Sequence, residues 1–99
     1  MTIEKKKDGS KVTFALEGRL DTTTSPELEA QLKDDLNDVT ELIFDMDKLE
    51  YISSAGLRVL LSAQKVMNKL GSMKVVKVNE DIMEIFDVTG FSDILTIEK

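Results

Sequence analysis

The sequence has no cysteine and no histidine among its 99 residues. Without a thiolate or an imidazole, the chain cannot form a disulfide, a Ser-His-Asp triad or a Cys-His dyad. The same absences remove the ligands of a typical zinc site. These gaps exclude several common classes of hydrolase and metalloprotein, and we expect neither a metal nor a cofactor.

The chain also lacks a long apolar run and a basic charge balance. No segment approaches the roughly 20 apolar residues that span a membrane, and residues 1–7 lack the apolar region of a signal peptide, so we expect a cytoplasmic protein without membrane contact. The net charge of −6 disfavours nucleic acid and fits a protein partner with a basic surface. With 41% apolar and 32% charged residues, the composition predicts one soluble domain over residues 1–99.

Apolar periodicity predicts an α/β fold. Alternation over residues 12–16 is typical of a half-buried strand, and the unbroken apolar centre of residues 39–45 indicates a strand buried on both faces. Strands that alternate with helices imply a mixed, mostly parallel sheet of four or five strands packed with three or four helices. The expected strands are residues 2–6, 12–16, 39–45, 73–78 and 94–97; a loop is expected over 18–24, and helices are expected with caps at Ser25, at the serine pair 53–54 and at Asn79.

The most informative segment is Tyr-Ile-Ser-Ser-Ala-Gly-Leu at residues 51–57. Its two serines lie where a buried strand meets a helix that Gly71 ends. Such a helix N-terminus presents free N–H groups and the positive end of the helix dipole, which stabilise a phosphate. Ser53 and Ser54 are therefore either helix caps or candidate phosphate acceptors. Gly56 is unfavourable in a first turn unless another group must approach its backbone closely.

The helix after the serines has two different faces. At about 100° per residue, one sector of about 120° forms the expected core stripe. Ser54, Leu57, Arg58 and Leu61 fall on another face, which we interpret as a small docking surface unless a neighbouring helix covers the leucines. The core stripe consists of Val59, Leu60, Ala63, Val66, Met67 and Leu70.

These residues resemble the STAS-domain anti-sigma factor antagonist family over essentially the whole chain. The resemblance includes Gly18-Arg19-Leu20-Asp21, the segment from Phe44 to Leu57 and Ile85-Phe86-Asp87-Val88-Thr89-Gly90-Phe91. It implies that Ser54 is phosphorylated by a partner that is both serine kinase and anti-sigma factor. It also implies that the unphosphorylated form binds this partner and frees a sigma factor, and that a serine phosphatase resets the switch.

The resemblance also assigns site residues. Family members usually have Asp before the acceptor, where this chain has Ser53, so Ser53 is the alternative acceptor. The glycine-led loop lies beside the acceptor in the family, which implies that Asp21 positions the kinase or the Ser54 hydroxyl; the alternative is an Asx turn with Thr23 or Thr24. The predicted partner-binding residues are Asp21, Thr22, Ser53, Ala55, Gly56, Leu57, Arg58 and Leu61.

Two other classes of function compete with a phosphorylation-switched binding module. An enzyme with Ser54 as nucleophile is disfavoured because the chain has no histidine and residues 52–56 lack the first glycine of a nucleophile elbow. A constitutive scaffold in a transport or stress-signalling assembly would need no phosphate cycle. The chain carries no phosphate-binding loop for ATP, so a kinase must be another protein.

Overall fold

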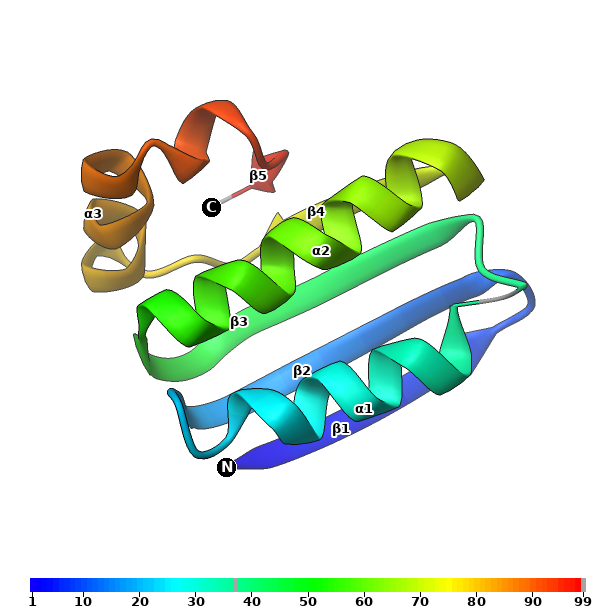
Figure 1. Cartoon of the computed structure of the whole chain (residues 1–99), viewed down its shortest axis with the longest axis horizontal. Helices are drawn as coiled ribbons and strands as arrows, with labels where there is room; N and C mark the ends of the chain where they lie inside the picture. Colours follow the sequence, from blue (N-terminus) through cyan, green and yellow to red (C-terminus); the bar gives the residue numbers. More distant parts are fainter. Residues whose placement is uncertain (37, 99) are drawn as a thin grey trace.

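The computed structural model describes residues 1–36 and 38–98, which form a mixed sheet with helices (Figure 1). Within these residues the sheet has five strands in the order β1-β2-β3-β4-β5. β1 is antiparallel to β2, and every other neighbouring pair is parallel, which confirms the predicted mixed, mostly parallel sheet. The strands are β1 (Thr2–Asp8), β2 (Lys11–Leu20), β3 (Glu41–Ile52), β4 (Ser72–Val76) and β5 (Ile97–Glu98).

Three α-helices accompany the described strands, as the α/β prediction required. They are α1 (Ser25–Asp35), α2 (Ser54–Leu70) and α3 (Glu80–Thr89), and a short 3₁₀ helix, η1 (Phe91–Asp93), follows. α1 and α2 run side by side along the sheet, whereas α3 lies toward one end (Figure 1). In the described parts of the chain, no helix is both long enough and apolar enough to span a bilayer.

The core lies between the sheet and its helices. Val12, Phe14 and Leu16 of β2 are buried while the residues between them are partly exposed, so the alternation prediction is confirmed. In β3 the apolar centre, residues 42–44, is buried throughout because strands flank it on both sides. Phe14 stacks on its register partner Phe44 with ring centroids 6.0 Å apart, which joins the two strands through their side chains.

The predicted core stripe of α2 was wrong at three positions. Leu57 is 6% exposed and belongs to the core, whereas Val66 and Leu70 are 42% and 41% exposed. The buried residues of α2 occupy an arc of about 160° that is rotated toward Leu57 and Gln64. This rotation arises because α2 packs over β3 and β4, while Val66 and Leu70 border an open apolar groove between α1 and α2.

The structure also corrects several boundaries. β2 continues to Leu20, so residues 18–20 lie in a strand and not in a loop. The strand predicted over 94–97 is wrong for residues 94–96, which are irregular after η1, and Ile97 belongs to the two-residue β5. Asn79 does cap α3: its side-chain oxygen accepts the Ile82 N–H at 2.9 Å, and its amide donates to the Leu49 carbonyl. Gly71 ends α2 as predicted.

Replacing Leu57 by Ala should lower the free energy of unfolding by about 2–5 kcal/mol, because it removes a buried side chain and leaves a cavity. Val66→Ala, on the exposed side of the same helix, should change that free energy by no more than about 0.5 kcal/mol. Urea unfolding followed by circular dichroism measures both. Equal effects of the two substitutions would contradict the observed orientation of α2.

Candidate functional site

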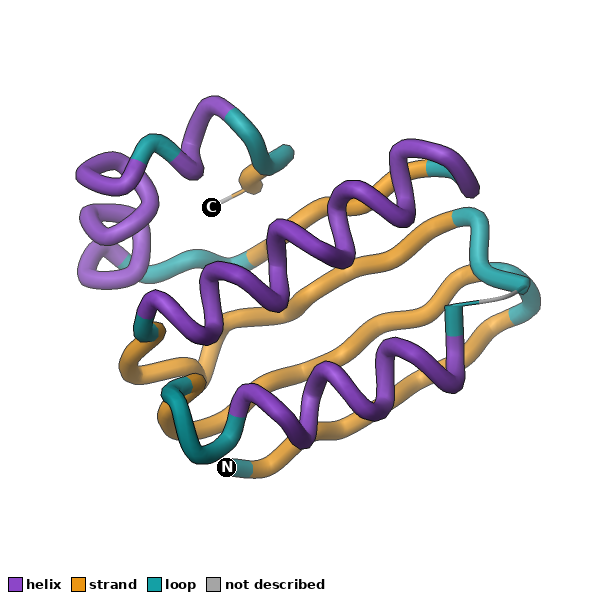
Figure 2. The backbone as a smooth tube through the Cα atoms, in the orientation of Figure 1, coloured by secondary structure: helices purple, strands orange, loops and turns teal. Residues whose placement is uncertain are grey.

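The candidate site lies at the sheet edge where the parallel strands β2 and β3 end together. Leu20 pairs with Ile52 in the strand register, and the Ser53 N–H donates to the Leu20 carbonyl at 2.9 Å. The loops that lead into α1 and α2 therefore lie at the same edge (Figure 2). The carboxyl ends of parallel strands are a common location for binding sites in open α/β sheets.

The two serines at this edge have different environments. Ser53 precedes α2 with extended backbone, and its hydroxyl oxygen is buried and has no hydrogen-bond partner among the described residues. Ser54 is the first residue of α2 and is exposed. Ser53 occupies the cap position, but its side chain forms no capping hydrogen bond, so the structure does not support side-chain capping as the reason for this serine.

Gly56 is buried where α2 approaches the end of β2. A Cβ atom at this position would lie 2.8 Å from the Leu20 and Ile52 side chains and 2.9 Å from the Leu20 carbonyl oxygen. The expected close approach is therefore present, and the approaching group belongs to this chain. Gly56 and Leu57 are both buried. Leu57 therefore does not contribute to the exposed face that was predicted for it, and Gly56, predicted to bind the partner, is covered as well.

Asp21 organises the turn before α1. Its carboxylate accepts the N–H groups of Thr23 and Thr24 at 3.0 and 3.1 Å and the Thr24 hydroxyl at 3.2 Å. The Asp21 carbonyl accepts the Ser25 N–H, so this turn leads directly into α1. The alternative interpretation, an Asx turn, is therefore present, and Asp21 has a structural role in this turn.

The cap assigned to Ser25 is a second correction at this turn. Ser25 is the first residue of α1 and is 3% exposed, and its hydroxyl has no hydrogen-bond partner within residues 1–36 and 38–98. The Asp21 carboxylate satisfies the N–H groups of the preceding turn instead. A carboxylate suits this position because it accepts hydrogen bonds from free N–H groups, and because the positive end of the helix dipole stabilises its negative charge.

The hydrogen bonds to Asp21 also alter its acidity. The backbone N–H of Thr24 is the main cause that lowers the pKa of the Asp21 carboxyl, with contributions from the Thr23 N–H, the Thr24 hydroxyl and the Arg19 charge, while partial desolvation opposes them. The Arg19 Nε atom lies 3.9 Å from the carboxylate. The charged form of Asp21 is thus the form that the fold stabilises.

Sequence analysis missed one contact at this edge. The Arg19 guanidinium lies over the Tyr51 ring, 4.5 Å from its centroid, in a cation–π arrangement. The two residues are register partners in β2 and β3. No signal in the sequence pairs them, because the register between two parallel strands depends on how the crossover helix packs.

A cleft between the N-terminal turns of α1 and α2 gathers several predicted residues. Thr22, Ala55 and Arg58 all line it, while Leu61 is half-buried farther along α2. The Asp21 carboxylate is directed at its own turn, and none of its hydrogen bonds within the described residues reaches Ser54. The cleft is lined by Thr22, Ser25, Glu29, Ala55, Arg58 and Ser62, among others.

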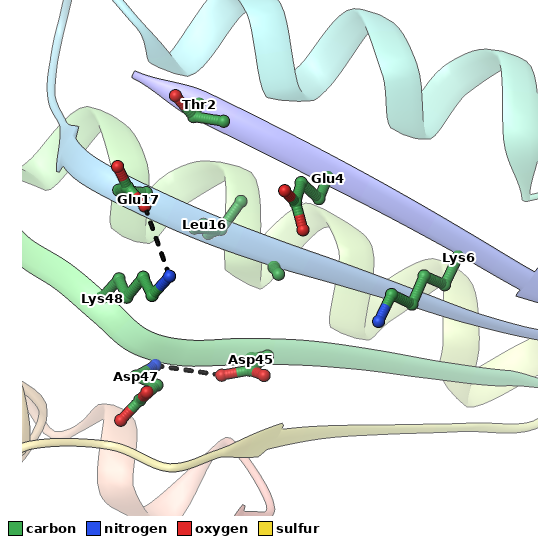
Figure 3. Close-up of a pocket in the computed structure, with 9 residues that line it drawn as sticks. Thr2, Glu4, Lys6, Leu16, Glu17, Asp45, Asp47 and Lys48 are labelled. Carbon is green, nitrogen blue, oxygen red and sulfur yellow. Dashed lines mark hydrogen bonds and ion pairs between the residues drawn. The ribbon is translucent and has the colours of Figure 1, made fainter.

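A second depression lies on the open face of the sheet, away from the serines (Figure 3). Charged side chains of β1, β2 and β3 line it, including Glu17 and Lys48, whose charged atoms are 3.8 Å apart. Helices α1 and α2 lie behind the strands in this view. None of the predicted site residues lines this depression, so the candidate site remains at the edge that carries Ser54.

Known proteins similar to this chain cover nearly all of it. Residues 2–99 match the STAS domain. BtrV of Bordetella bronchiseptica, described as an anti-sigma factor antagonist, is 30% identical over 84 residues, which are 83% of this chain and 72% of BtrV. The anti-sigma-B factor antagonist of Bacillus subtilis is 26% identical over 98 residues, which are 98% of this chain and 90% of that protein.

Solved structures share the fold. The anti-sigma factor antagonist SpoIIAA in its unphosphorylated form has a TM-score of 0.80 at 16% identity, over 99% of this chain and 88% of SpoIIAA. The phosphorylated form of Bacillus SpoIIAA has a TM-score of 0.78 at 16% identity, over 99% and 92% of the two chains. At this identity the likeness establishes the fold, which is the α/β fold predicted from the sequence.

Asp21→Asn should remove a pH-dependent part of the stability. Because the fold lowers the pKa of Asp21, its contribution is present above the unfolded pKa of about 3.9 and is lost as the pH falls through the folded-state pKa. The variant should be less stable than wild type at pH 6, and the difference should shrink toward pH 2. Urea unfolding at several pH values measures the difference in unfolding free energy between the two proteins. A difference that stays constant with pH would contradict the role of the Asp21 charge.

Gly56→Ala should destabilise the fold, although Ala normally favours a helix by about 1 kcal/mol over Gly. The added methyl group would overlap Leu20 and Ile52, and overpacking of this kind costs about 1–3 kcal/mol. Ser62→Ala, at an exposed position of the same helix, is the matched control and should have little effect. Thermal unfolding of both variants tests the close approach, which a stabilised Gly56→Ala variant would refute.

Proposed function

This chain belongs to the STAS domain family, and we propose that it is an anti-sigma factor antagonist switched by phosphorylation of Ser54. In its unphosphorylated form it binds an anti-sigma factor that is also a serine kinase, and this binding releases a sigma factor. Phosphorylation ends the binding, and a serine phosphatase restores it. The names of BtrV and of the Bacillus subtilis relative support the antagonist role.

The accessibility of the two serines carries the proposal. A kinase must reach the acceptor hydroxyl, and Ser54 is exposed whereas the Ser53 hydroxyl oxygen is buried. Modification of Ser53 would require the junction between β3 and α2 to open, because the Ser53 N–H is tied to Leu20. This contrast favours Ser54 as the acceptor. SpoIIAA, which shares the fold, has been solved in unphosphorylated and phosphorylated forms.

The energetics favour a switch in binding rather than in folding. A phosphate adds a charge of about −1.5 to −2. Within the domain, the N-terminus of α2 stabilises a negative charge by roughly 0.3–2 kcal/mol, so the fold should tolerate it. At an interface, a like charge opposite the phosphate costs several kcal/mol. Since 1.4 kcal/mol corresponds to a tenfold change in affinity, one phosphate is sufficient to end binding.

The proposed partner surface surrounds Ser54. Thr22, Ala55 and Arg58 border the cleft at the N-terminal ends of α1 and α2, and Leu61 lies on the adjoining face of α2. Asp21 holds the turn that presents Thr22, so its contribution to kinase binding is through the position of this turn. Gly56 and Leu57 act through packing, since both are buried.

A binding module also fits the chemistry of the site better than an enzyme does. The chain has no histidine to activate a serine. The site combines the exposed start of α2 with the cleft between α1 and α2. This cleft shares Glu29, Val59 and Ser62 with the apolar groove between the same two helices. We therefore assign Ser54 the role of a modified residue and not that of a nucleophile.

Incubation with ATP and an anti-sigma factor kinase from the same organism should phosphorylate the wild-type chain at Ser54. Ser53→Ala should still be modified, and Ser54→Ala should not, because only the Ser54 hydroxyl is exposed. Mass spectrometry of the digested protein locates the phosphate. Phosphate on Ser53, or phosphorylation retained in Ser54→Ala, would overturn the assignment.

Isothermal titration calorimetry against the same kinase completes the test. Phosphorylated protein should bind at least tenfold more weakly than unphosphorylated protein, and Ser54→Ala should bind as the unphosphorylated form does. Equal affinities of both forms would favour a constitutive scaffold without a phosphate cycle, such as a subunit of a transport or stress-signalling assembly.

A further inference from the structure

Arg58 lies one helical turn after Ser54 on the exposed face of α2. Its Nε atom is 3.5 Å from the Ser54 carbonyl oxygen, so the side chain folds back over the first turn of the helix. This direction is expected, because helical side chains lean toward the N-terminus and cover the turn before their own Cα atom. The guanidinium group therefore lies beside the residue that we propose as the phosphate acceptor.

The carboxylates near this guanidinium group pair with other residues, so the group is available to bind an anion. Within residues 1–36 and 38–98, Arg58 forms no ion pair with a carboxylate at 4.0 Å or less. Glu29, which lines the same cleft from α1, pairs with Lys33 at 3.3 Å. Asp21 at the sheet edge is engaged by Arg19 and by its own turn. Arg58 would lose the long hydrogen bond to the Ser54 carbonyl oxygen if its guanidinium group turned to bind an anion.

We infer that Arg58 is the intramolecular counter-ion of a phosphoryl group on Ser54, an inference that rests on the proposed function. Two guanidinium N–H groups would donate to two phosphoryl oxygens in a bidentate, charge-assisted pair. An acid four residues before a base is the favourable order for such a pair on a helix. The free N–H groups at the start of α2 would contact the same phosphoryl group from the backbone side.

This arrangement has a measurable electrostatic consequence. A nearby cation stabilises the dianion of phosphoserine over the monoanion, so it lowers the second pKa of the phosphate, which is ordinarily about 6. Because the chain has no histidine, no side chain of ordinary pKa titrates between about pH 5 and 7. A titration across this interval therefore reports on the phosphate alone.

The test uses the 99-residue chain with phosphoserine incorporated at position 54 during translation. The ³¹P resonance is followed from pH 4.5 to 8 in the wild-type background and in the Arg58→Gln and Lys65→Gln backgrounds. Lys65 is an exposed cation of the same helix, but it lies about 16 Å along the axis from Ser54, beyond the screening length of about 8 Å. It is the matched control for the loss of one positive charge.

Arg58→Gln should move the ³¹P midpoint to higher pH by roughly half a pH unit, whereas Lys65→Gln should leave it at the wild-type value. Equal midpoints in all three proteins would overturn the inference. If Arg58→Gln with phosphoserine does not fold, a second measurement tests the ion pair. The proton resonance of Arg58 Nε–H is compared between wild-type protein with serine and with phosphoserine at position 54. It should move downfield when position 54 is phosphoserine, and an unchanged resonance would again overturn the inference.

These measurements use neither the kinase nor the partner. Failure of the ion pair would leave the proposed phosphorylation switch standing, because helix N-terminal stabilisation and repulsion at the interface do not require Arg58. Conversely, an intact ion pair in a protein that no kinase modifies would count against the proposed function alone.

Discussion

The parallel pairing of β2 with β3 is the constraint on which the site depends. The hydrogen bond from the Ser53 N–H to the Leu20 carbonyl, 2.9 Å long, extends this pairing to the residue before α2. Since both strands end at the same edge, the turn at Asp21 and the N-terminus of α2 become neighbours. Gly56 then has to be a glycine, because Leu20 occupies the space that a Cβ atom would need.

The same constraint separates the two serines. Ser53 completes the strand pairing and turns its hydroxyl inward, whereas Ser54 begins the helix and faces solvent. A site built in this way offers hydrogen-bond donors and positive potential at the start of α2, and the Asp21 carboxylate at the same edge is engaged by Thr23 and Thr24. In the function that we propose, a kinase adds a phosphate to Ser54, and the site presents this charge at the interface with its partner.

The effect of a negative charge at this position depends on its surroundings. The helix N-terminus and Arg58 surround Ser54 with positive potential, so a phosphate is compatible with the fold. Against a partner surface that contributes like charge or apolar groups, the same phosphate is unfavourable. Under the proposed function, this difference in sign lets one phosphorylation alter partner binding while the domain stays folded.

Several features could be predicted from the residues alone: the α/β class, the strand alternation of β2, the cap at Asn79, the end of α2 at Gly71 and the position of the serine pair at a helix start. These features depend on the local periodicity of apolar residues and on residue types that commonly begin or end helices. Three features depend on the packed fold: Leu57 is buried, Val66 and Leu70 are exposed, and Arg19 lies on Tyr51. The rotation of a helix and the register of parallel strands follow from packing between segments far apart in the chain, and no local pattern encodes that packing.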